Sequence, residues 1–436
     1  MSSVHPTTKN EQLATNRTKV PASGVYREVE PELEGAALHG ECNWMTELQA
    51  ILKAWRNLKN EERDAVLATV VHVAGSAYRR PGARLLLLPG SRRIGSVSGG
   101  CLEGEIARKA WWWTESSPIS LKVFDTTSED DAVWGFGLGC NGVVEVLIER
   151  VNAPGGAQLL QFLEEAQASR KPVVIVTVVR SSSDSEFQLG QRLLAGNGLI
   201  RGELAVSQQA DCLTHYALEA LQKRGSQFIN LERADLFIEY VPPSPSLVIL
   251  GAGYDTRPLV TIAKELGFYV TVSDARPGNL SQDCFPDVDK LVLLANIDSA
   301  RSLPIDADDA VVLMTHSYGL DHQCLPGILT IGPRYLGLLG PRARAERLFA
   351  DLGRTIPDYV HAPVGLDIGG DSPASVALSI LAEIQAVFEG RSGNMLKHKR
   401  GPIHTSLVSE TATDTACRNS EAVHSFGGEV QISSNA

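Results

Sequence analysis

The 436-residue sequence lacks long apolar runs. No run approaches the ~18–20 consecutive apolar residues that a membrane-spanning helix needs. The N-terminal stretch MSSVHPTTKNEQLATNRTKV also lacks the hydrophobic core of a secretory signal. We therefore expect a cytoplasmic protein with no membrane partner.

Basic residues are in deficit as well. The chain has 40 Lys and Arg residues against 51 Asp and Glu residues, which gives a formal net charge of -11 at pH 7. Binding of nucleic acid depends on basic side chains that neutralise phosphates. The charge balance therefore argues against a nucleic-acid partner, while a small basic pocket stays compatible with it.

Paired cysteine motifs are absent too. The seven cysteines are odd in number, and no two have the CxxC spacing of a zinc site or a redox pair. Most are expected to be small, buried and reduced. They are Cys42, Cys101, Cys140, Cys212, Cys284, Cys324 and Cys417.

What the sequence does contain is a folded region between two polar ends. Residues 1–40 and 391–436 are rich in polar residues without helical or strand period, so we expect disordered tails there. Between them we expect a glycine-rich α/β domain over 41–150, a connecting α/β segment over 151–245 and a Rossmann-like domain over 246–390. The proline-rich stretch VPPSPS marks the clearest domain boundary.

The last of these domains alternates strand and helix patterns. The strands SLVILGAG, FYVTVSD, KLVLLA, DDAVVLMTHS and RYLGLLG are continuous apolar runs, and PLVTIAKELG and SPASVALSILAEIQAVFEG read as helices. Such alternation predicts a parallel sheet covered on both faces. The expected fold class is α/β, with an N-terminal glycine-rich α/β module followed by a C-terminal Rossmann-like doubly wound parallel sheet.

A dinucleotide-binding pattern opens this domain. Gly251 and Gly253 follow a strand and precede a helix, and Asp274 ends the next strand at the ~20-residue offset of a ribose-binding acid. Gly251 would make the tight turn, and Gly253 would let the backbone approach a pyrophosphate at the helix N-terminus. The pattern predicts a site for NAD(P) or another dinucleotide, although a strand-to-helix turn can carry these glycines for geometry alone.

Two neighbouring residues bear on this pattern. Thr256 stands where a third glycine is usual, which weakens the match because it loosens the approach of helix and strand. Arg276, two residues after Asp274, would accept a 2′-phosphate or another anionic group, or would be a solvated loop arginine. Both interpretations of Arg276 stay open at the level of sequence.

Three glycine-dense loops mark the N-terminal module, in VAGSAYRRPGARLLL, RRIGSVSGGCLEGEI and DAVWGFGLGCNGVVEV. Such loops leave backbone amides open to a ligand, as in an anion or phosphate pocket. Arg79, Arg80 and Arg84 in the first loop supply charge suited to a phosphate.

Two of these loops carry a cysteine. Ser98, Gly99, Gly100 and Cys101 precede a probable helix, whose N-terminus would favour the Cys101 thiolate and metal binding. Cys140 in GLGCNG is the second candidate metal ligand. The alternative for each is a buried structural cysteine.

Two further features of this module have alternative interpretations. Glu103 would cap the helix or act as a proton acceptor. The run Trp111–Trp113 is better explained by helix-end packing or a domain contact than by binding.

Taken together, these motifs resemble the xanthine dehydrogenase accessory factors, the XdhC/CoxI family. GSAYRRPGARLLL, IGSVSGGCLEGEI and GLGCNGVVEVLIE are similar to its N-terminal domain. VILGAGYDTRPLVTIAKELGFYVTVSDAR, THSYGLD, YLGLLGPRAR and HAPVGLDIGGDSPASVALSILAEI are similar to its C-terminal Rossmann domain. The resemblance covers nearly all of residues 44–390, and Asn141 departs from it, because a small residue is expected in that cysteine loop.

The resemblance implies a chaperone rather than an enzyme. Such a factor binds molybdenum cofactor (molybdopterin), protects it while a partner cysteine desulfurase supports its sulfuration, and delivers it to a xanthine dehydrogenase-like molybdenum hydroxylase. By this analogy Cys101 or Cys140 would contact the metal, and the arginines of the first loop would hold the pterin phosphate. We also expect a homo-oligomer.

The competing hypothesis is an NAD(P)-dependent oxidoreductase. In THSYGLDH, residues His316, Asp321 and His322 follow a predicted strand at the sheet edge where ligands of doubly wound folds bind, and would serve acid–base chemistry. His361 is another possible base. The loop after it contains Gly365, Gly369 and Gly370, which suggest a second phosphate-binding loop.

Overall fold

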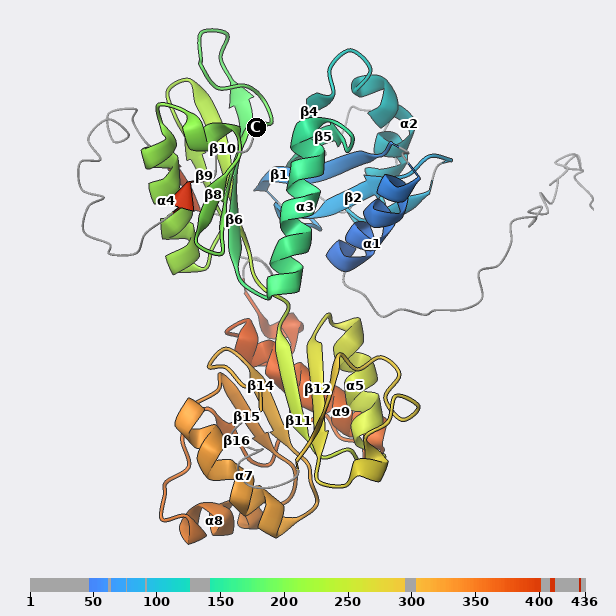
Figure 1. Cartoon of the computed structure of the whole chain (residues 1–436), viewed down its shortest axis with the longest axis vertical. Coiled ribbons are helices and arrows are strands. Elements are labelled where there is room, and N and C mark those ends of the chain that lie inside the picture. Colours follow the sequence, from blue (N-terminus) through green and yellow to red (C-terminus); the bar gives the residue numbers. More distant parts are fainter. Residues whose placement is uncertain are drawn as a thin grey trace, which may run out of the picture. The chain divides into compact units, whose positions relative to one another are not determined.

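A computed structural model describes residues 47–61, 64–75, 77–90, 92–125, 142–294 and 303–400, with two short strands farther on. These residues form an α/β fold built on three sheets (Figure 1). The expected tail over 1–40 lies outside the described residues, as does most of 391–436. No described helix has the length and apolar character needed to cross a bilayer.

The first sheet is antiparallel and has the order β3-β2-β1-β5-β4. Alternate residues of its central strand face opposite ways: Val66 and Ala68 pack under helix α2, while Leu67 packs against α1 and α3. Both faces of the sheet are therefore covered. The elements are α1 (Glu47–Asn60), β1 (Val66–Gly75), β2 (Arg84–Leu87), β3 (Arg93–Gly95), α2 (Glu103–Trp113), β4 (Ile119–Asp125), β5 (Gly142–Arg150) and α3 (Pro154–Ser169).

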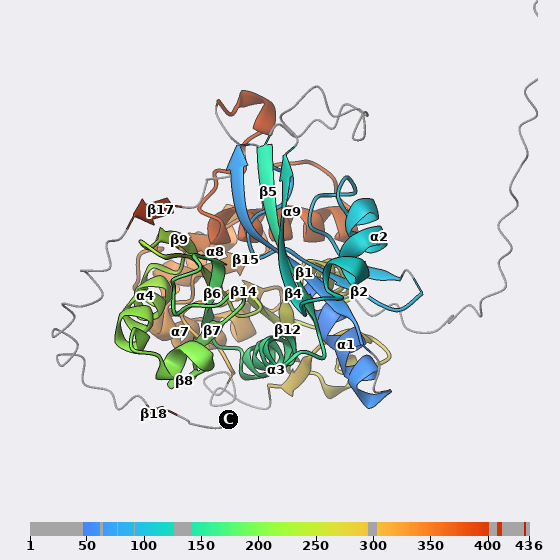
Figure 2. The same ribbon diagram turned by 90° about the horizontal axis from the view of Figure 1, so that it is seen from above.

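The second sheet has the order β17-β9-β10-β6-β7-β8-β18. Helix α4 covers one face, and α3 contacts both β7 of this sheet and α1 of the first (Figure 2). The elements are β6 (Val173–Ser181), β7 (Arg192–Gly196), β8 (Leu199–Arg201), η1 (Glu203–Val206), α4 (Ala210–Lys223), β9 (Gln227–Asn230), β10 (Ala234–Val241), β17 (Val408–Thr411) and β18 (Gln431–Ile432).

These first two sheets share buried side chains. Ile175 of β6 and Leu194 of β7 belong to the same hydrophobic cluster as Leu52 of α1 and Leu160 of α3. A buried bidentate ion pair also joins Arg84 of β2 to Glu239 of β10. The segment after residue 150 therefore completes the core of the residues before it.

The third sheet is parallel throughout and has the order β13-β12-β11-β14-β15-β16. Leu247 and Ile249 face helices α5 and α9, whereas Val248 and Leu250 face α7 and α8 (Figure 1). The elements are β11 (Ser246–Leu250), α5 (Thr256–Glu265), β12 (Tyr269–Asp274), η2 (Pro277–Asn279), β13 (Lys290–Leu293), β14 (Ala310–Leu313), α7 (Tyr318–Ile331), β15 (Tyr335–Leu338), α8 (Arg342–Asp351), β16 (Val360–His361), α9 (Pro373–Phe388) and η3 (Leu396–His398).

The order of this third sheet confirms the predicted doubly wound fold. Chain order runs outward from β11 to β13 on one side and from β14 to β16 on the other, so the direction switches between β11 and β14. Ligands of such sheets bind at the carboxyl ends of the strands beside this switch point.

Candidate functional site

Gly251 lies at the switch point, at the carboxyl end of β11. Its φ of 122° lies in the region that favours glycine, and a Cβ there would overlap the carbonyl oxygen of Met314 on the neighbouring strand. Its amide donates to Ser273 of β12 at 2.7 Å. Glycine is therefore required at this position by the close approach of β11, β12 and β14.

Thr256 replaces the third glycine of the usual pattern. It is fully buried, and its hydroxyl donates to the Gly251 carbonyl at 2.8 Å. The threonine therefore fixes the turn from the helix side, where a glycine would only allow close packing.

Three backbone amides between these two residues are unpaired among the residues that the structure describes. Within the described part of the chain, the amides of Gly253, Tyr254 and Asp255 have no hydrogen-bond acceptor, and they open helix α5. Amides at a helix N-terminus attract anions, because the helix dipole adds to their partial charges. This turn is suited to a phosphate group.

Asp274, the predicted ribose acid, is already saturated. Its oxygens accept from the amide of Ala252 at 2.7 Å, and from the Arg276 amide at 2.8 Å and guanidinium at 2.8 and 2.9 Å. Burial alone would raise its pKa, but these hydrogen bonds lower it to about 2. Asp274 and Arg276 thus hold the glycine turn against β12.

His316 lies at the same carboxyl edge of the sheet as Gly251. It follows β14, has a left-handed φ of 57°, and its Nε2 lies 2.8 Å from a carboxylate oxygen of Asp255. A non-glycine residue seldom adopts this conformation, and such strain is concentrated at functional sites. Nothing in the sequence pattern indicated the contact with Asp255, since 61 positions separate the two residues.

The other two residues of THSYGLDH proposed for acid–base chemistry, Asp321 and His322, lie on helix α7. Asp321 is buried, accepts from the Thr315 hydroxyl at 2.6 Å and pairs with Arg344 at 2.6 Å. His322 lies on α7 with its ring stacked near Tyr318. Of the three residues proposed for acid–base chemistry, the structure brings His316 to the switch point.

His361 belongs to a separate cluster at the end of β16. Its ring stacks on that of Tyr335, with centroids 4.4 Å apart, and its Nδ1 lies 3.1 Å from Glu383. The same carboxylate accepts from the Tyr335 hydroxyl at 2.5 Å and from the Gly365 amide at 2.8 Å. Burial opposes ionisation of Glu383, but these contacts lower its pKa overall.

The glycines after His361 differ in their surroundings. A Cβ on Gly365 would overlap Ser379, and one on Gly370 would overlap Ser375, whereas Gly369 has open space. Two of the three are therefore needed for packing against α9.

In the first sheet, Glu103 organises the cysteine loop. Its carboxylate accepts five hydrogen bonds, from the hydroxyls of Ser96 and Ser98 and the amides of Val97, Ser98 and Gly100. Burial opposes ionisation, but these bonds lower the pKa of Glu103 to about 2. The amides expected to bind a ligand are instead largely occupied by the chain's own carboxylate.

The end of this loop is open. Among the described residues, no atom lies within 4 Å of a Cβ placed on Gly100, and Cys101 is half-buried and not disulfide-bonded. Gly99 lies against the ring of Tyr78, which belongs to the arginine-containing first loop. The structure thus brings the first two glycine-rich loops together around Cys101.

The three arginines of the first loop have different surroundings. Arg84 is buried and paired with Glu239, so its role is structural. Arg79 pairs with Glu47 at the start of α1. Arg80 is exposed in the same turn.

The remaining cysteines are only partly described. Cys140 and Asn141 lie outside the described residues. Cys212 is buried, as expected for most of the cysteines, but it is disulfide-bonded and therefore not reduced. Cys284 and Cys324 are not disulfide-bonded.

Comparison with known proteins assigns both halves of the described region. The XdhC Rossmann domain model matches residues 247–384, and the XdhC and CoxI family model matches residues 58–124. A probable xanthine dehydrogenase subunit from Bacillus subtilis (strain 168) is 32% identical over 352 residues, which are 78% of this chain and 96% of the relative.

Two further relatives agree with this assignment. The molybdenum cofactor insertion chaperone PaoD of Escherichia coli (strain K12) is 24% identical over 337 residues, 74% of this chain and 84% of the relative. The crystal structure of a xanthine dehydrogenase from Bacillus halodurans superposes with a TM-score of 0.66 at 32% identity, covering 80% of this chain and 97% of that one.

Proposed function

The chain belongs to the XdhC and CoxI family, and on that premise we propose that it is a maturation factor that binds molybdenum cofactor as its cargo. In this proposal it supports sulfuration of the cofactor by a cysteine desulfurase and delivers the product to a xanthine dehydrogenase-type molybdenum hydroxylase. It acts as a cytoplasmic homo-oligomer. The similarity to the molybdenum cofactor insertion chaperone PaoD supports this choice of cargo.

The observation that carries the proposal is the Cys101 loop. Five hydrogen bonds to Glu103 fix the loop, and no described residue lies within 4 Å of a Cβ placed on Gly100, the neighbour of Cys101. A cysteine sulfur is a soft ligand of the kind that suits molybdenum or its sulfido group. Cys101 is therefore the residue we assign to the metal end of the cargo, with Cys140 as the second candidate.

The charged end of the cargo needs cations. Arg79 and Arg80 belong to the loop whose Tyr78 ring lies against Gly99. Guanidinium groups bind phosphate through paired hydrogen bonds. We assign the pterin phosphate to this loop, with the exposed Arg80 as the more accessible of the two.

The turn at the switch point, between β11 and α5, is the proposed site for a dinucleotide. Gly251 holds the turn, and the amides of Gly253, Tyr254 and Asp255 receive the phosphates. The carboxylate of Asp274 already accepts hydrogen bonds from Arg276 and Ala252. We therefore assign it to holding this turn and not to binding a ribose hydroxyl. The proposed ligand is NAD(P) or a dinucleotide form of the cargo itself.

The cargo proposal is tested by measuring molybdenum and pterin per protein, purified from a host that makes the cofactor. The parent is expected to retain both, and Cys101→Ser is expected to lose most of the metal, because the hydroxyl is a poorer ligand than the thiolate. Cys284→Ser is the matched control, since Cys284 is also half-buried and not disulfide-bonded. Equal retention by both variants, or a parent without pterin, overturns the proposal.

A second candidate function rests on His316. Its strained backbone and its contact with Asp255 place an imidazole at the phosphate turn, as in an NAD(P)-dependent oxidoreductase. This candidate requires the full chain to bind NAD or NADP in calorimetry and to lose that affinity in the Gly253→Asp variant. Binding of neither nucleotide by the parent rejects it.

A further inference from the structure

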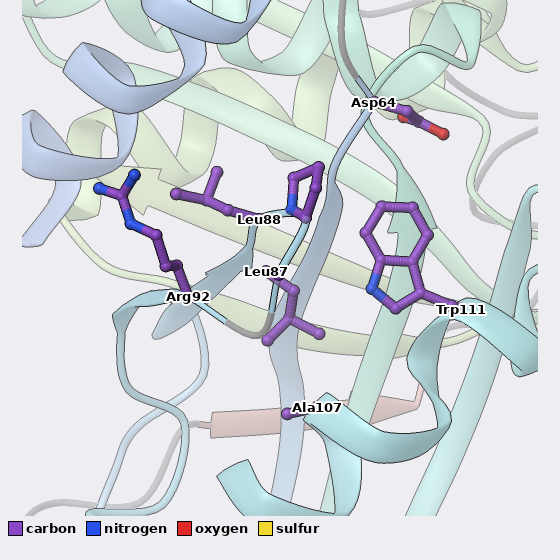
Figure 3. A pocket seen from close by; sticks show the side chains of 8 residues that line it. Asp64, Leu87, Leu88, Arg92, Ala107 and Trp111 are labelled. Atoms are coloured by element: carbon purple, nitrogen blue, oxygen red, sulfur yellow. The ribbon is translucent and has the colours of Figure 1, made fainter. Parts of the chain in front are cut away.

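A pocket that the proposed function leaves unused lies between the β2–β3 turn and helix α2 (Figure 3). Its volume is about 510 Å³, which falls in the ~300–1,000 Å³ range of small-molecule sites. The residues that line it are Asp64, Leu87, Leu88, Pro89, Gly90, Arg92, Ala107 and Trp111.

The walls of the pocket are mainly apolar. Leu87 and Leu88 are buried, and Ala107 and Trp111 lie one turn apart on the same side of α2. Figure 3 shows the two leucines between Arg92 on one side and Trp111 on the other. An apolar ligand of limited length would therefore contact the leucines along its body and a different polar group at each end.

Trp111 differs from the two tryptophans that follow it. Trp113 packs edge-on against Phe124, with ring centroids 6.2 Å apart, and Trp112 is 67% exposed. Trp111 presents its indole to the pocket, and in the described part of the chain its indole N–H has no acceptor. Packing accounts for Trp113 but not for this free donor on Trp111.

The charges around the pocket do not cancel. Arg150 lies 4.5 Å from the centre of the Trp111 ring, donates to the Thr114 hydroxyl at 2.8 Å and pairs with Asp64 at 3.1 Å. Asp64 is therefore neutralised. Arg92 is exposed, and among the described residues its guanidinium has no ion pair or hydrogen bond, so Arg92 and Arg150 together exceed the single negative charge of Asp64 by one.

We propose that this pocket binds a planar aromatic or heteroaromatic ring that carries one anionic group, with the ring beside Trp111 and the anion at Arg92. A flat ring matches the apolar walls and the indole, and an acceptor atom on it satisfies the indole N–H. A guanidinium without a counter-ion favours a carboxylate or phosphate over a neutral group. This site is additional to Cys101 and needs no metal.

Two sources of this chemistry are a simple aromatic acid and a pterin. Full-length protein without cofactor is titrated by calorimetry with 2-naphthoate and with pterin-6-carboxylate, and neutral naphthalene-2-methanol serves as the charge control. At least one acid is expected to bind, with the alcohol weaker by roughly tenfold, the usual size of a lost charge-assisted hydrogen bond. Tighter binding of the pterin makes the pocket part of the cargo site, and tighter binding of the naphthoate makes it a separate ligand site.

Two pairs of variants locate the binding. Arg92→Gln is expected to weaken the preferred acid roughly tenfold, while Arg93→Gln, at the adjacent arginine that is equally exposed but does not line the pocket, stays within about twofold. Ala107→Leu fills the pocket and is expected to abolish binding, while Trp112→Phe leaves it unchanged.

A readout in the unmodified protein guards against misfolded variants. The protein is labelled with nitrogen-15 at its tryptophans and followed by NMR, with the indole signal of Trp111 assigned from the Trp111→Phe variant. That signal is expected to shift on titration, while the signal of Trp112 does not. Failure of the parent to bind either acid, or equal affinity of Arg92→Gln and the parent, overturns the proposal. The outcome is independent of molybdenum retention, so the cargo proposal can fail while this one holds.

Discussion

At the scale of single residues, two buried carboxylates hold the two loops that define the candidate sites. Glu103 gathers the amides of the cysteine loop, and Asp274 gathers those of the glycine turn. In both, hydrogen bonds outweigh the cost of burial and lower the pKa of the carboxyl to about 2. Each loop is therefore shaped by an anion that belongs to the chain.

Glu103→Gln is expected to destabilise the protein by about 1–3 kcal/mol. The NH₂ group of the new side chain would face the hydroxyl and amide donors that now bond to the carboxylate, which leaves buried donors unsatisfied. The free energy of unfolding in urea measures this. Glu115→Gln is the control, since Glu115 is exposed after the end of the same helix. A loss no larger than that of the control would show that the loop holds its shape without the carboxylate.

The same residue gives a pH dependence. Its pKa falls from the ordinary 4.5 to about 2 on folding, so its contribution is fully present above pH 4.5 and is lost as the pH falls towards 2. The melting temperature of the parent should therefore drop more steeply than that of Glu103→Gln over this interval. Parallel melting curves for the two proteins would contradict the assignment.

The sequence predicted the positions of these loops but not their internal partners. A run such as SVSGGCLEGE indicates that glycine leaves backbone amides open to an acceptor. The sequence is compatible with Glu103 as a helix cap or as a proton acceptor. Which acceptor takes the amides depends on how the loop folds back on α2, and no spacing rule encodes that. The open space at Gly100 and the ring of Tyr78 against Gly99 likewise emerge only in three dimensions.

At the scale of elements, the turn between β11 and α5 is the most tightly specified part of the C-terminal domain. Gly251→Ala is expected to cost more than ~2 kcal/mol, because the new Cβ overlaps the Met314 carbonyl in a backbone conformation that alanine avoids. Thermal unfolding measures the loss.

Gly278→Ala serves as its control, because nothing lies within 4 Å of a Cβ there and its φ is not in the left-handed region. That variant should change the stability by less than ~1 kcal/mol. Similar losses at the two positions would mean that helix α5 can shift to make room.

Helices α7 and α8 show the limit of pattern reading at this scale. The alternation of apolar strands predicted the parallel sheet, and the order of the strands confirms it. The sequence predicted a covering on both faces of the sheet but did not locate these two helices, since α7 contains Pro326 and its apolar residues are not confined to one stripe, while α8 is short and rich in arginine. Tertiary burial of Leu325, Leu348 and Phe349 stabilises both helices where local pattern is weak.

At the scale of the whole molecule, the first two sheets share a hydrophobic core and buried ion pairs. Arg84 pairs with Glu239, and Arg192 pairs with Glu149, in each case between the two sheets and with both side chains buried. A fragment of residues 41–150 would leave the α1 face of the first sheet and these charges without partners. We expect it to lack a cooperative thermal transition.

A fragment of residues 41–245 is expected to melt cooperatively, because it contains the first sheet, strands β6 to β10 of the second sheet and α3. Circular dichroism of the two fragments compares them directly. A cooperative transition in the shorter fragment would show that 41–150 is a domain in its own right. The sequence placed a division at residue 150 because glycine density falls there, and composition does not reveal that α3 and β6 supply the opposite wall of the core.

The hydrogen bonds by which Glu103 orders the cysteine loop have a thermodynamic consequence for binding. A loop that is already fixed loses little conformational freedom when it meets its ligand, so association needs no slow closing step. We expect heat-capacity changes on binding that match the ligand's own buried surface, with no added contribution from folding of the loop. A carrier must also release its cargo, and at such a site a few direct contacts set the lifetime of the complex. We expect the contact of the Cys101 sulfur to be one of them.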